Sequence, residues 1–338
     1  MSDILNKLTK QITENQILPA DQMTAGFDEM MEGKASPVQM AAFLIALKMR
    51  GEAPSDIAAG ARSLRRHALT LDAPDNAMDI VGTGGDGIGT YNISTATALV
   101  LAGAGIPIAK HGNKAVSSKS GAADVLTALG INLDCSEEAL SEALTAAKIV
   151  FLMAPRHHSA MRHVGPIRAE LGVRTIFNLL GPLSNPALVR RILVGVFDAR
   201  WLQPFAEALR TLGTTDAFIV HGADGLDELS TTGSNQITML KDGQISETTL
   251  HPSDLSLPTA SLSDIKGGSA EENATALREL LSGKEGPYRN IVLMNAAAAF
   301  VAGGHEKEMA VGLERARQSI DTKAAQSALD QLISITNK

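Results

Sequence analysis

The sequence predicts a small N-terminal helical domain followed by a larger α/β domain, whose mainly parallel central sheet is flanked by helices. Residues 1–72 contain helix signals but no strand pattern, whereas from Met78 onward short β-branched runs alternate with alanine-rich helical stretches. This alternation is typical of a parallel sheet, because each parallel pair of strands needs a crossover connection. The polar segment 72–76 contains Pro74. We interpret it as the linker between a domain at 1–72 and a domain at 76–338.

The N-terminal part carries clear signals for the start and end of helices. Ser36 followed by Pro37 predicts a helix start, because serine caps free backbone amides and proline fits the first turn. Gly51 ends that helix, and Pro54 begins the next one. A later segment near 165–190 is expected to pack on these helices.

The expected strands are short runs rich in β-branched and other aliphatic residues. They are Met78–Val81, Ile106–Ala109, Ile149–Met153, Ile192–Val196, Ala217–Val220, Gln236–Leu240 and Gln244–Thr249. The last two flank Asp242 and Gly243, a pair that favours a hairpin turn. From Ala270 to the end the pattern returns to amphipathic helices.

Composition argues against several classes of protein. The chain has 338 residues, of which 44% are hydrophobic, and a formal net charge of −7, so its surface repels nucleic acids and anionic membranes. The longest apolar stretch, around 93–109, is interrupted by serine, threonine, glycine and proline, which argues against a membrane span. The single cysteine, Cys135, excludes an internal disulfide and fits a reducing compartment. We expect a soluble, cytoplasmic protein with no nucleic-acid or membrane partner.

A glycine-rich loop, Gly82–Asp86, follows the first expected strand. Glycine accepts positive φ, so several backbone N–H groups in such a loop can approach one anion. Asn92–Thr95 then begins an apolar helix, whose N-terminal end also attracts anions. The loop lacks the end of a P-loop and the spacing of a dinucleotide fingerprint. It indicates a phosphate or diphosphate site, with a glycine turn that binds no ligand as the alternative.

A second polar segment, Lys110–Gly121, begins where the next expected strand ends. Ligands of open parallel sheets bind at the carboxyl ends of the strands, so this segment and the glycine loop should meet there. Its three lysines, its hydroxyl groups and its glycines suit a ligand with several phosphates. The alternative is a solvated polar loop.

These segments resemble the signature of the anthranilate phosphoribosyltransferases, of the nucleoside-phosphorylase type. The resemblance rests on Gly82–Asp86, Asn92–Thr95, Lys110–Gly121 and Arg168–Pro186, and it runs in order along essentially the whole chain. It implies a pentosyltransferase of tryptophan biosynthesis that moves the 5-phosphoribosyl group from phosphoribosyl diphosphate (PRPP) to the amine of anthranilate. It also implies a homodimer and Mg²⁺ as the cofactor, with two ions per active site.

The resemblance further implies the roles of individual residues. Those that it assigns to PRPP are Gly82, Gly85, Asp86, Thr90, Asn92, Ile93, Ser94, Thr95, Lys110, His111, Gly112, Asn113, Lys114, Ala115, Val116, Ser117, Ser118 and Ala122. Those that it assigns to anthranilate are Gly82, Asn113 and Arg168, and those that it assigns to Mg²⁺ are Ser94, Asp227 and Glu228. Without the resemblance, the two adjacent acids would be read as a solvated loop. The chain departs from the family pattern at Tyr91, Lys114 and Ala122, where phenylalanine, arginine and serine are common.

The histidines leave alternatives open. His111 is a candidate to accept the amine proton, and His158 lies near the acceptor in the family pattern, with a role in proton transfer undecided. His157, His158 and His163 could suggest zinc, but two of them are adjacent and cannot easily share a tetrahedral site. The competing functions are a pyrimidine nucleoside phosphorylase, which shares the fold, and a non-catalytic nucleic-acid-binding relative.

Overall fold

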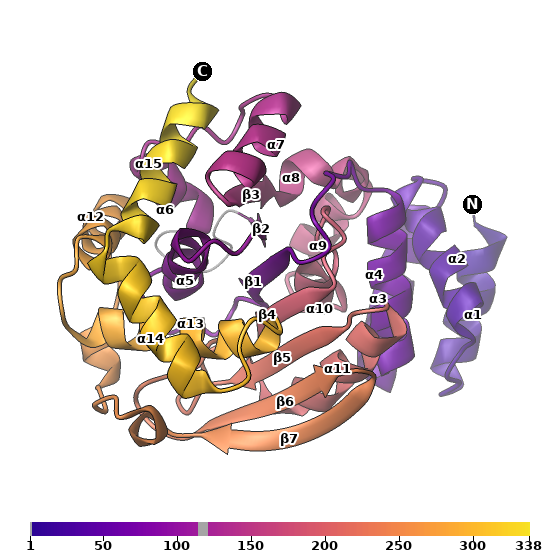
Figure 1. Ribbon diagram of the computed structural model, residues 1–338. Helices are drawn as coiled ribbons and strands as arrows, with labels where there is room; N and C mark the ends of the chain where they lie inside the picture. Colours follow the sequence, from indigo (N-terminus) through magenta and orange to yellow (C-terminus); the bar gives the residue numbers. More distant parts are fainter. Residues whose placement is uncertain (1, 114–120) are drawn as a thin grey trace.

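The computed structural model describes residues 2–113 and 121–338 (Figure 1). The first four helices form a separate layer at one side of the molecule. They are α1 (Asp3–Thr13), α2 (Ala20–Met31), α3 (Pro37–Arg50) and α4 (Pro54–Arg66). Ser36 caps α3 as predicted: its side chain accepts from Gln39 N, and Gln39 in turn accepts from Ser36 N at 3.0 Å. Gly51 ends this helix with a φ of 91°, a conformation that favours glycine.

The central sheet has the strand order β3-β2-β1-β4-β5-β6-β7. Its strands are β1 (Met78–Gly82), β2 (Ile108–Gly112), β3 (Ile149–Met153), β4 (Arg191–Gly195), β5 (Asp216–His221), β6 (Asn235–Lys241) and β7 (Gln244–Leu250). The strands β1 to β5 pair in parallel, and β6 and β7 add an antiparallel hairpin at one edge. The predicted fold class, a mainly parallel sheet flanked by helices, is confirmed.

One strand differs from the prediction by more than one residue at its ends. The sequence predicts Ile106–Ala109, but β2 begins at Ile108. Pro107 has no N–H to donate to the ladder, and Ile106 N donates to Leu101 O at 3.1 Å, which closes the preceding helix. The strand also continues to Gly112, so Lys110 and His111 lie within it rather than in a loop.

The remaining helices pack on the sheet or on the helices that cover it. They are α5 (Ile93–Gly103), α6 (Ala122–Ala128), α7 (Glu137–Ala146), α8 (Ala154–His157), α9 (Gly165–Leu171), α10 (Phe177–Leu180), α11 (Leu202–Thr211), α12 (Ala270–Leu281), α13 (Pro287–Ala302), α14 (Met309–Asp321) and α15 (Ala324–Thr336). Short 3₁₀ helices occur at Ser159–His163, Gly181–Leu183, Ala199–Trp201, Pro252–Leu255 and Leu262–Ile265. No helix of the described ranges is both long and apolar enough to cross a membrane.

Alternate residues of the central strand β4 enter two different hydrophobic cores. In β4, Leu193 packs into a core with α5 and α13, while Ile192 and Val194 face a core shared with α1–α4 and α11. The second core also contains Ile167 of α9 and Phe177 of α10. This period of two is the ordinary consequence of strand geometry. Because both faces are covered, functional groups gather at the ends of the strands.

Candidate active site

The glycine loop after β1 holds the loop after β5 in place. Gly84 N donates to Asp227 Oδ2 at 2.6 Å, which joins two segments 143 residues apart. A Cβ atom at Gly82 would lie 2.1 Å from Asp227 Oδ2, and one at Gly195 would lie 1.4 Å from the Asp227 carbonyl oxygen. Real Cβ atoms do not approach so closely. Glycine at the ends of β1 and β4 is therefore what lets Asp227 lie against both strands.

The neighbouring carboxylate, Glu228, binds the start of α5. Its Oε1 accepts from Ser94 N at 3.0 Å and from Ser94 Oγ at 2.8 Å. Ser94 lies in the first turn of α5, two residues after Asn92, the residue at the N-cap position. The N-terminal end of this helix thus holds a carboxylate with both a backbone amide and a hydroxyl group. The structure brings Ser94, Asp227 and Glu228 together, as the resemblance implies for ligands of one metal centre.

Both carboxyl groups resist ionisation. Burial, followed by the nearby charge of Asp86, raises the pKa of Asp227 to about 7. Burial, followed by the charge of Asp227, raises the pKa of Glu228 to about 8. Two adjacent acids that are costly to ionise fit a cation, whose charge would favour the carboxylate forms. No group of three or more His, Cys, Asp or Glu suited to a metal occurs in the described chain. Further ligands of such an ion would be substrate oxygens or water, the usual arrangement for Mg²⁺.

A buried polar cluster lies below the ends of β1 and β2. Lys110 Nζ donates to Ile80 O at 2.5 Å, and Asp79 accepts from His111 N at 3.2 Å and from Asn185 Nδ2 at 2.7 Å. Burial lowers the pKa of Lys110, and the charges of Asp79, Glu228 and Asp227 oppose that shift. Lys110 is therefore a cation whose charge interacts with both acids of the pair. Sequence reasoning missed Asp79 and Asn185, although an acid inside a buried strand is a signal that could have found Asp79.

His111 is buried and neutral. Burial, with the charge of His158 as the next cause, lowers the pKa of His111 to about 3. Its Nδ1 lies 3.1 Å from Gly181 O, and its ring meets that of His158 edge to face at 5.2 Å. Within the described ranges its Nε2 has no hydrogen-bond partner. We infer that Nδ1 carries the proton and that Nε2 keeps its lone pair.

Arg168 is a half-buried cation on α9. Its guanidinium lies 5.4 Å from the centre of the Phe177 ring. Burial lowers the pKa of Arg168, and no carboxylate of the described residues forms an ion pair with it. A desolvated guanidinium without a protein counter-ion fits a carboxylate ligand, which it can bind through two parallel hydrogen bonds.

Aromatic and polar contacts fix the segment between the glycine loop and α5. Tyr91 stacks on Tyr288 at 4.5 Å, and Tyr288 Oη donates to Asn92 O at 3.3 Å. Asn273 Nδ2 donates to Asn92 Oδ1 at 3.0 Å, and Thr90 pairs with Lys266 in an isolated bridge. These partners come from the C-terminal third of the chain, and sequence reasoning did not find them.

A second unpredicted contact joins the glycine loop to the helical layer. Arg174 donates to Gly85 O and stacks on the Phe197 ring at 4.2 Å. Lys48 Nζ of α3 donates to Arg174 O at 2.8 Å. The chain Lys48–Arg174–Gly85 thus connects α3 with the rim of the candidate site.

The other predicted residues take several positions. Ile93 and Thr95 are buried in the first turn of α5; Gly112 and Asn113 follow His111 at the end of β2; and Ala122 begins α6. Lys114, Ala115, Val116, Ser117 and Ser118 lie outside the described residues. His157 is not part of the site; its Nδ1 instead lies 2.7 Å from Leu69 O.

Comparison with known proteins agrees with this geometry. Residues 2–68 match the model of the glycosyl transferase family helical bundle domain, and residues 74–326 match that of the glycosyl transferase family a/b domain. The anthranilate phosphoribosyltransferase of Parvibaculum lavamentivorans is 52% identical, over 97% of this chain and 96% of that protein.

Solved structures agree as well. The crystal structure of the anthranilate phosphoribosyltransferase from Thermus thermophilus has a TM-score of 0.93 and 42% identity, covering 98% of this chain and 99% of that one. The enzyme from Saccharomyces cerevisiae, in complex with PRPP and Mg, has a TM-score of 0.91 and 30% identity, covering 100% and 99%. The resemblance seen in the motifs is thereby confirmed, and the chain belongs to the anthranilate phosphoribosyltransferase family.

Proposed function

We propose that this protein transfers the 5-phosphoribosyl group of PRPP to the amine of anthranilate, giving N-(5-phosphoribosyl)anthranilate and diphosphate in tryptophan biosynthesis. The observation that carries the proposal is the meeting of the glycine loop, the start of α5 and two carboxyl groups at the carboxyl ends of β1 and β5. This is the position where open parallel sheets bind their ligands. The family assignment supports the same reaction.

The metal site of the proposal consists of Ser94, Asp227 and Glu228, which would hold two Mg²⁺ ions together with the diphosphate of PRPP. Mg²⁺ supplies charge neutralisation and orientation of the leaving diphosphate when it is bound. The support from this chain is the buried acidic pair with its raised pKa values. The yeast relative, solved with PRPP and Mg, provides independent support.

In this proposal, binding and positioning account for most of the catalysis. The bond between ribose C1 and the diphosphate oxygen breaks with its electron pair on oxygen, and the amine nitrogen forms the new bond to C1. Lys110, a buried cation, and the amides of the glycine loop stabilise the charge that builds on the diphosphate. The remaining assigned residues, from Gly82 to Thr95 and from His111 to Ala122, hold and orient PRPP.

The acceptor side uses Arg168, Asn113 and the backbone of Gly82. Arg168 binds the anthranilate carboxylate and thereby directs the amine toward ribose C1. The amine of an aniline is already neutral, so no base is needed to create the nucleophile. The arylammonium formed with the new bond is itself a strong acid, and His111, although a weak base, suffices to take its proton at Nε2. His158 contacts His111 and would act through it rather than on the substrate.

A coupled pair of assays tests the reaction. Mixing the protein with anthranilate, PRPP and Mg²⁺ is expected to remove anthranilate fluorescence and release one diphosphate for each anthranilate consumed. Phosphorolysis of thymidine and uridine serves as the comparison, because a pyrimidine nucleoside phosphorylase would carry it out. Turnover of these nucleosides without turnover of anthranilate would contradict the proposal.

Metal binding should depend on pH in a specific way. A carboxyl group with a raised pKa contributes folding stability below its ordinary pKa, and that contribution is lost as pH rises through the raised value. The stability contributed by Asp227 is lost as pH rises through about 7, and that of Glu228 as pH rises through about 8. We expect Mg²⁺ to raise the Tm more at about pH 8 than at about pH 6, because protons compete with the metal. Thermal shift measurements check this, and an equal rise in the Glu228→Gln variant would contradict it.

We propose that the chain divides into a helical domain at 1–72 and an α/β domain at 76–338, with the segment near 165–190 packing on the helices. The support is the shared core, in which Ile167 and Phe177 lie with the residues of α1–α4. A cytoplasmic location is part of the same proposal, and the one cysteine, which is free and buried, is in keeping with it.

The proposed homodimer forms through α1 and α3. An apolar groove of about 720 Å³ lies along these helices, and on α3 Val38 is 78% exposed and Met49 is 80% exposed. Exposed apolar side chains along a groove are typical of an interface. Replacing Val38 and Met49 by glutamate is expected to convert dimer to monomer in sedimentation velocity. The matched control replaces Val173 by glutamate, since Val173 is exposed but lies outside the groove. A dimer that survives the double change would contradict this interface.

A further inference from the structure

A second pocket, which we call the rear pocket, lies at the amino ends of β4 and β5, whereas the candidate active site lies at the carboxyl ends of the strands. It has a volume of about 500 Å³ and is lined by Arg62, Arg65 and Arg66 of α4, together with Leu188, Arg190 and Leu212. Arg190 directly precedes β4, and Leu212 lies in the connection that leads to β5. Because β4 and β5 are parallel, these positions mark the amino ends of the strands, whereas the acidic pair lies near the carboxyl ends.

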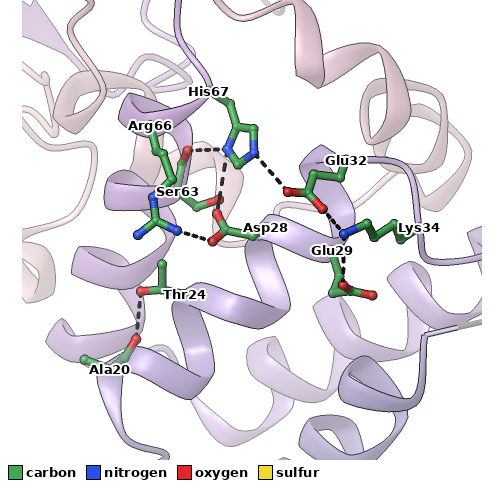
Figure 2. Close-up of polar contacts among 9 residues, drawn as sticks. All are labelled: Ala20, Thr24, Asp28, Glu29, Glu32, Lys34, Ser63, Arg66 and His67. Carbon is green, nitrogen blue, oxygen red and sulfur yellow. Dashed lines mark hydrogen bonds and ion pairs between the residues drawn. The ribbon is translucent and has the colours of Figure 1, made fainter.

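The charge of the rear pocket is largely uncompensated by the protein. Arg66 forms an ion pair with Asp28 of α2, as Figure 2 shows. Within the described ranges, Arg62, Arg65 and Arg190 form no ion pair with any carboxylate. Arg65 Nε donates to Leu183 O at 2.7 Å, and Arg190 Nε donates to Gly213 O at 3.0 Å. Three guanidinium groups without a counter-ion among the described residues thus share one pocket, in a chain whose net charge is −7.

Burial affects one of these three groups, because Arg190 is exposed and Arg62 is half-buried. Desolvation lowers the pKa of Arg65 to about 10. Helix C-termini favour basic residues, which accounts for Arg65 and Arg66 in the last turn of α4. That effect does not account for Arg190, which comes from a different segment and faces the same pocket. An oxyanion would supply the missing negative charge and accept paired hydrogen bonds from the guanidinium groups.

We propose that the rear pocket is a second binding site, which takes a small organic anion bearing a phosphate ester or a carboxylate. Its volume lies in the range of sites for small molecules, roughly 300–1,000 Å³. Leu188, which is 46% exposed, and Leu212 provide an apolar wall for a short carbon skeleton. The site joins α4 to the segments that enter β4 and β5, so an occupant stabilises the contact between the helical layer and the sheet.

Calorimetry tests this site with glycerol 3-phosphate, inorganic phosphate and succinate as separate probes, which distinguish an ester, a free phosphate and a carboxylate. The active site is first saturated with PRPP and Mg²⁺. We expect saturable binding of glycerol 3-phosphate or succinate by the wild-type protein. Arg62→Gln and Arg190→Gln should each weaken it about tenfold or more, the size of one lost charged hydrogen bond. Arg65 is left unchanged because its hydrogen bond to Leu183 O is partly buried, whereas the bond of Arg190 to Gly213 O is exposed to solvent.

The control replaces Arg317 by glutamine, which makes the same change of charge on α14, far from the rear pocket. This variant should bind the probes like the wild type, and all variants should retain the wild-type Tm and rate of phosphoribosyl transfer. Equal affinity of the wild type and the Arg62→Gln/Arg190→Gln double variant would overturn the proposal. So would the lack of saturable heat from every probe at concentrations up to about 10 mM.

Discussion

Replacing Glu228 by glutamine is expected to lower kcat/KM for phosphoribosyl transfer by about 10²–10³-fold, the size of losing one strong electrostatic contact to a transition state. Glutamine keeps an oxygen that can accept from Ser94 N and Oγ, so the local hydrogen bonds survive. It has no charge, however, and so is a poor ligand for Mg²⁺. The variant should also need a higher Mg²⁺ concentration than the wild type to reach its half-maximal rate.

Two readouts separate this effect from a folding defect. The neutral side chain removes the repulsion between Asp227 and Glu228, so the metal-free variant should be at least as stable as the wild type near pH 8. The control is Glu247→Gln, which neutralises an exposed acid on β7. An unchanged dependence of the rate on Mg²⁺ in the Glu228→Gln variant would remove this residue from the metal site.

Replacing Arg168 by alanine is expected to raise the KM for anthranilate by about 10–100-fold while leaving the KM for PRPP nearly unchanged. The expected size follows from the loss of one bidentate contact to a carboxylate, about 1.5–3 kcal/mol. Arg168→Lys keeps the charge but not the paired geometry, so an intermediate effect is expected. Steady-state kinetics with each substrate varied in turn measures the split.

Arg162→Ala is the matched control, because Arg162 is an exposed arginine six residues before Arg168. Its KM values should remain those of the wild type. The role assigned to Arg168 would be refuted by equal increases in the KM for both substrates. Loss of the packing of Arg168 on Phe177 would appear instead as a lower Tm, which thermal unfolding measures separately.

Most of the architecture could be predicted from the sequence, because its signals are local. The Ser36 cap, the Gly51 helix end and the strand Ile149–Met153 all follow from residues within a few positions. The start of β2 was predicted two residues too early, because β-branched residues flank Pro107 and pattern alone gives them equal weight. The hydrogen bond of Ile106 N to Leu101 O and the missing N–H of Pro107 keep these two residues out of the strand.

The candidate site could be predicted only in part. The glycine loop and the motif around Lys110 can be recognised from the sequence. The carboxylates can be assigned to the site only through contacts such as that of Gly84 N with Asp227, across 143 residues. Asp79 and Asn185, 106 residues apart, meet beneath Lys110 for the same reason and were missed. Long-range pairing of polar groups has no local pattern, so spacing rules cannot reveal it.

Titration calorimetry of PRPP is the most direct test of the central claim that glycine amides, lysines and Mg²⁺ together hold this sugar at the carboxyl ends of the strands. With Mg²⁺ present, we expect saturable heat with one PRPP per chain. Affinity should fall sharply when the metal is chelated or when Glu228 is replaced by glutamine. Lack of any heat from PRPP at about 1 mM with Mg²⁺ present would contradict the account.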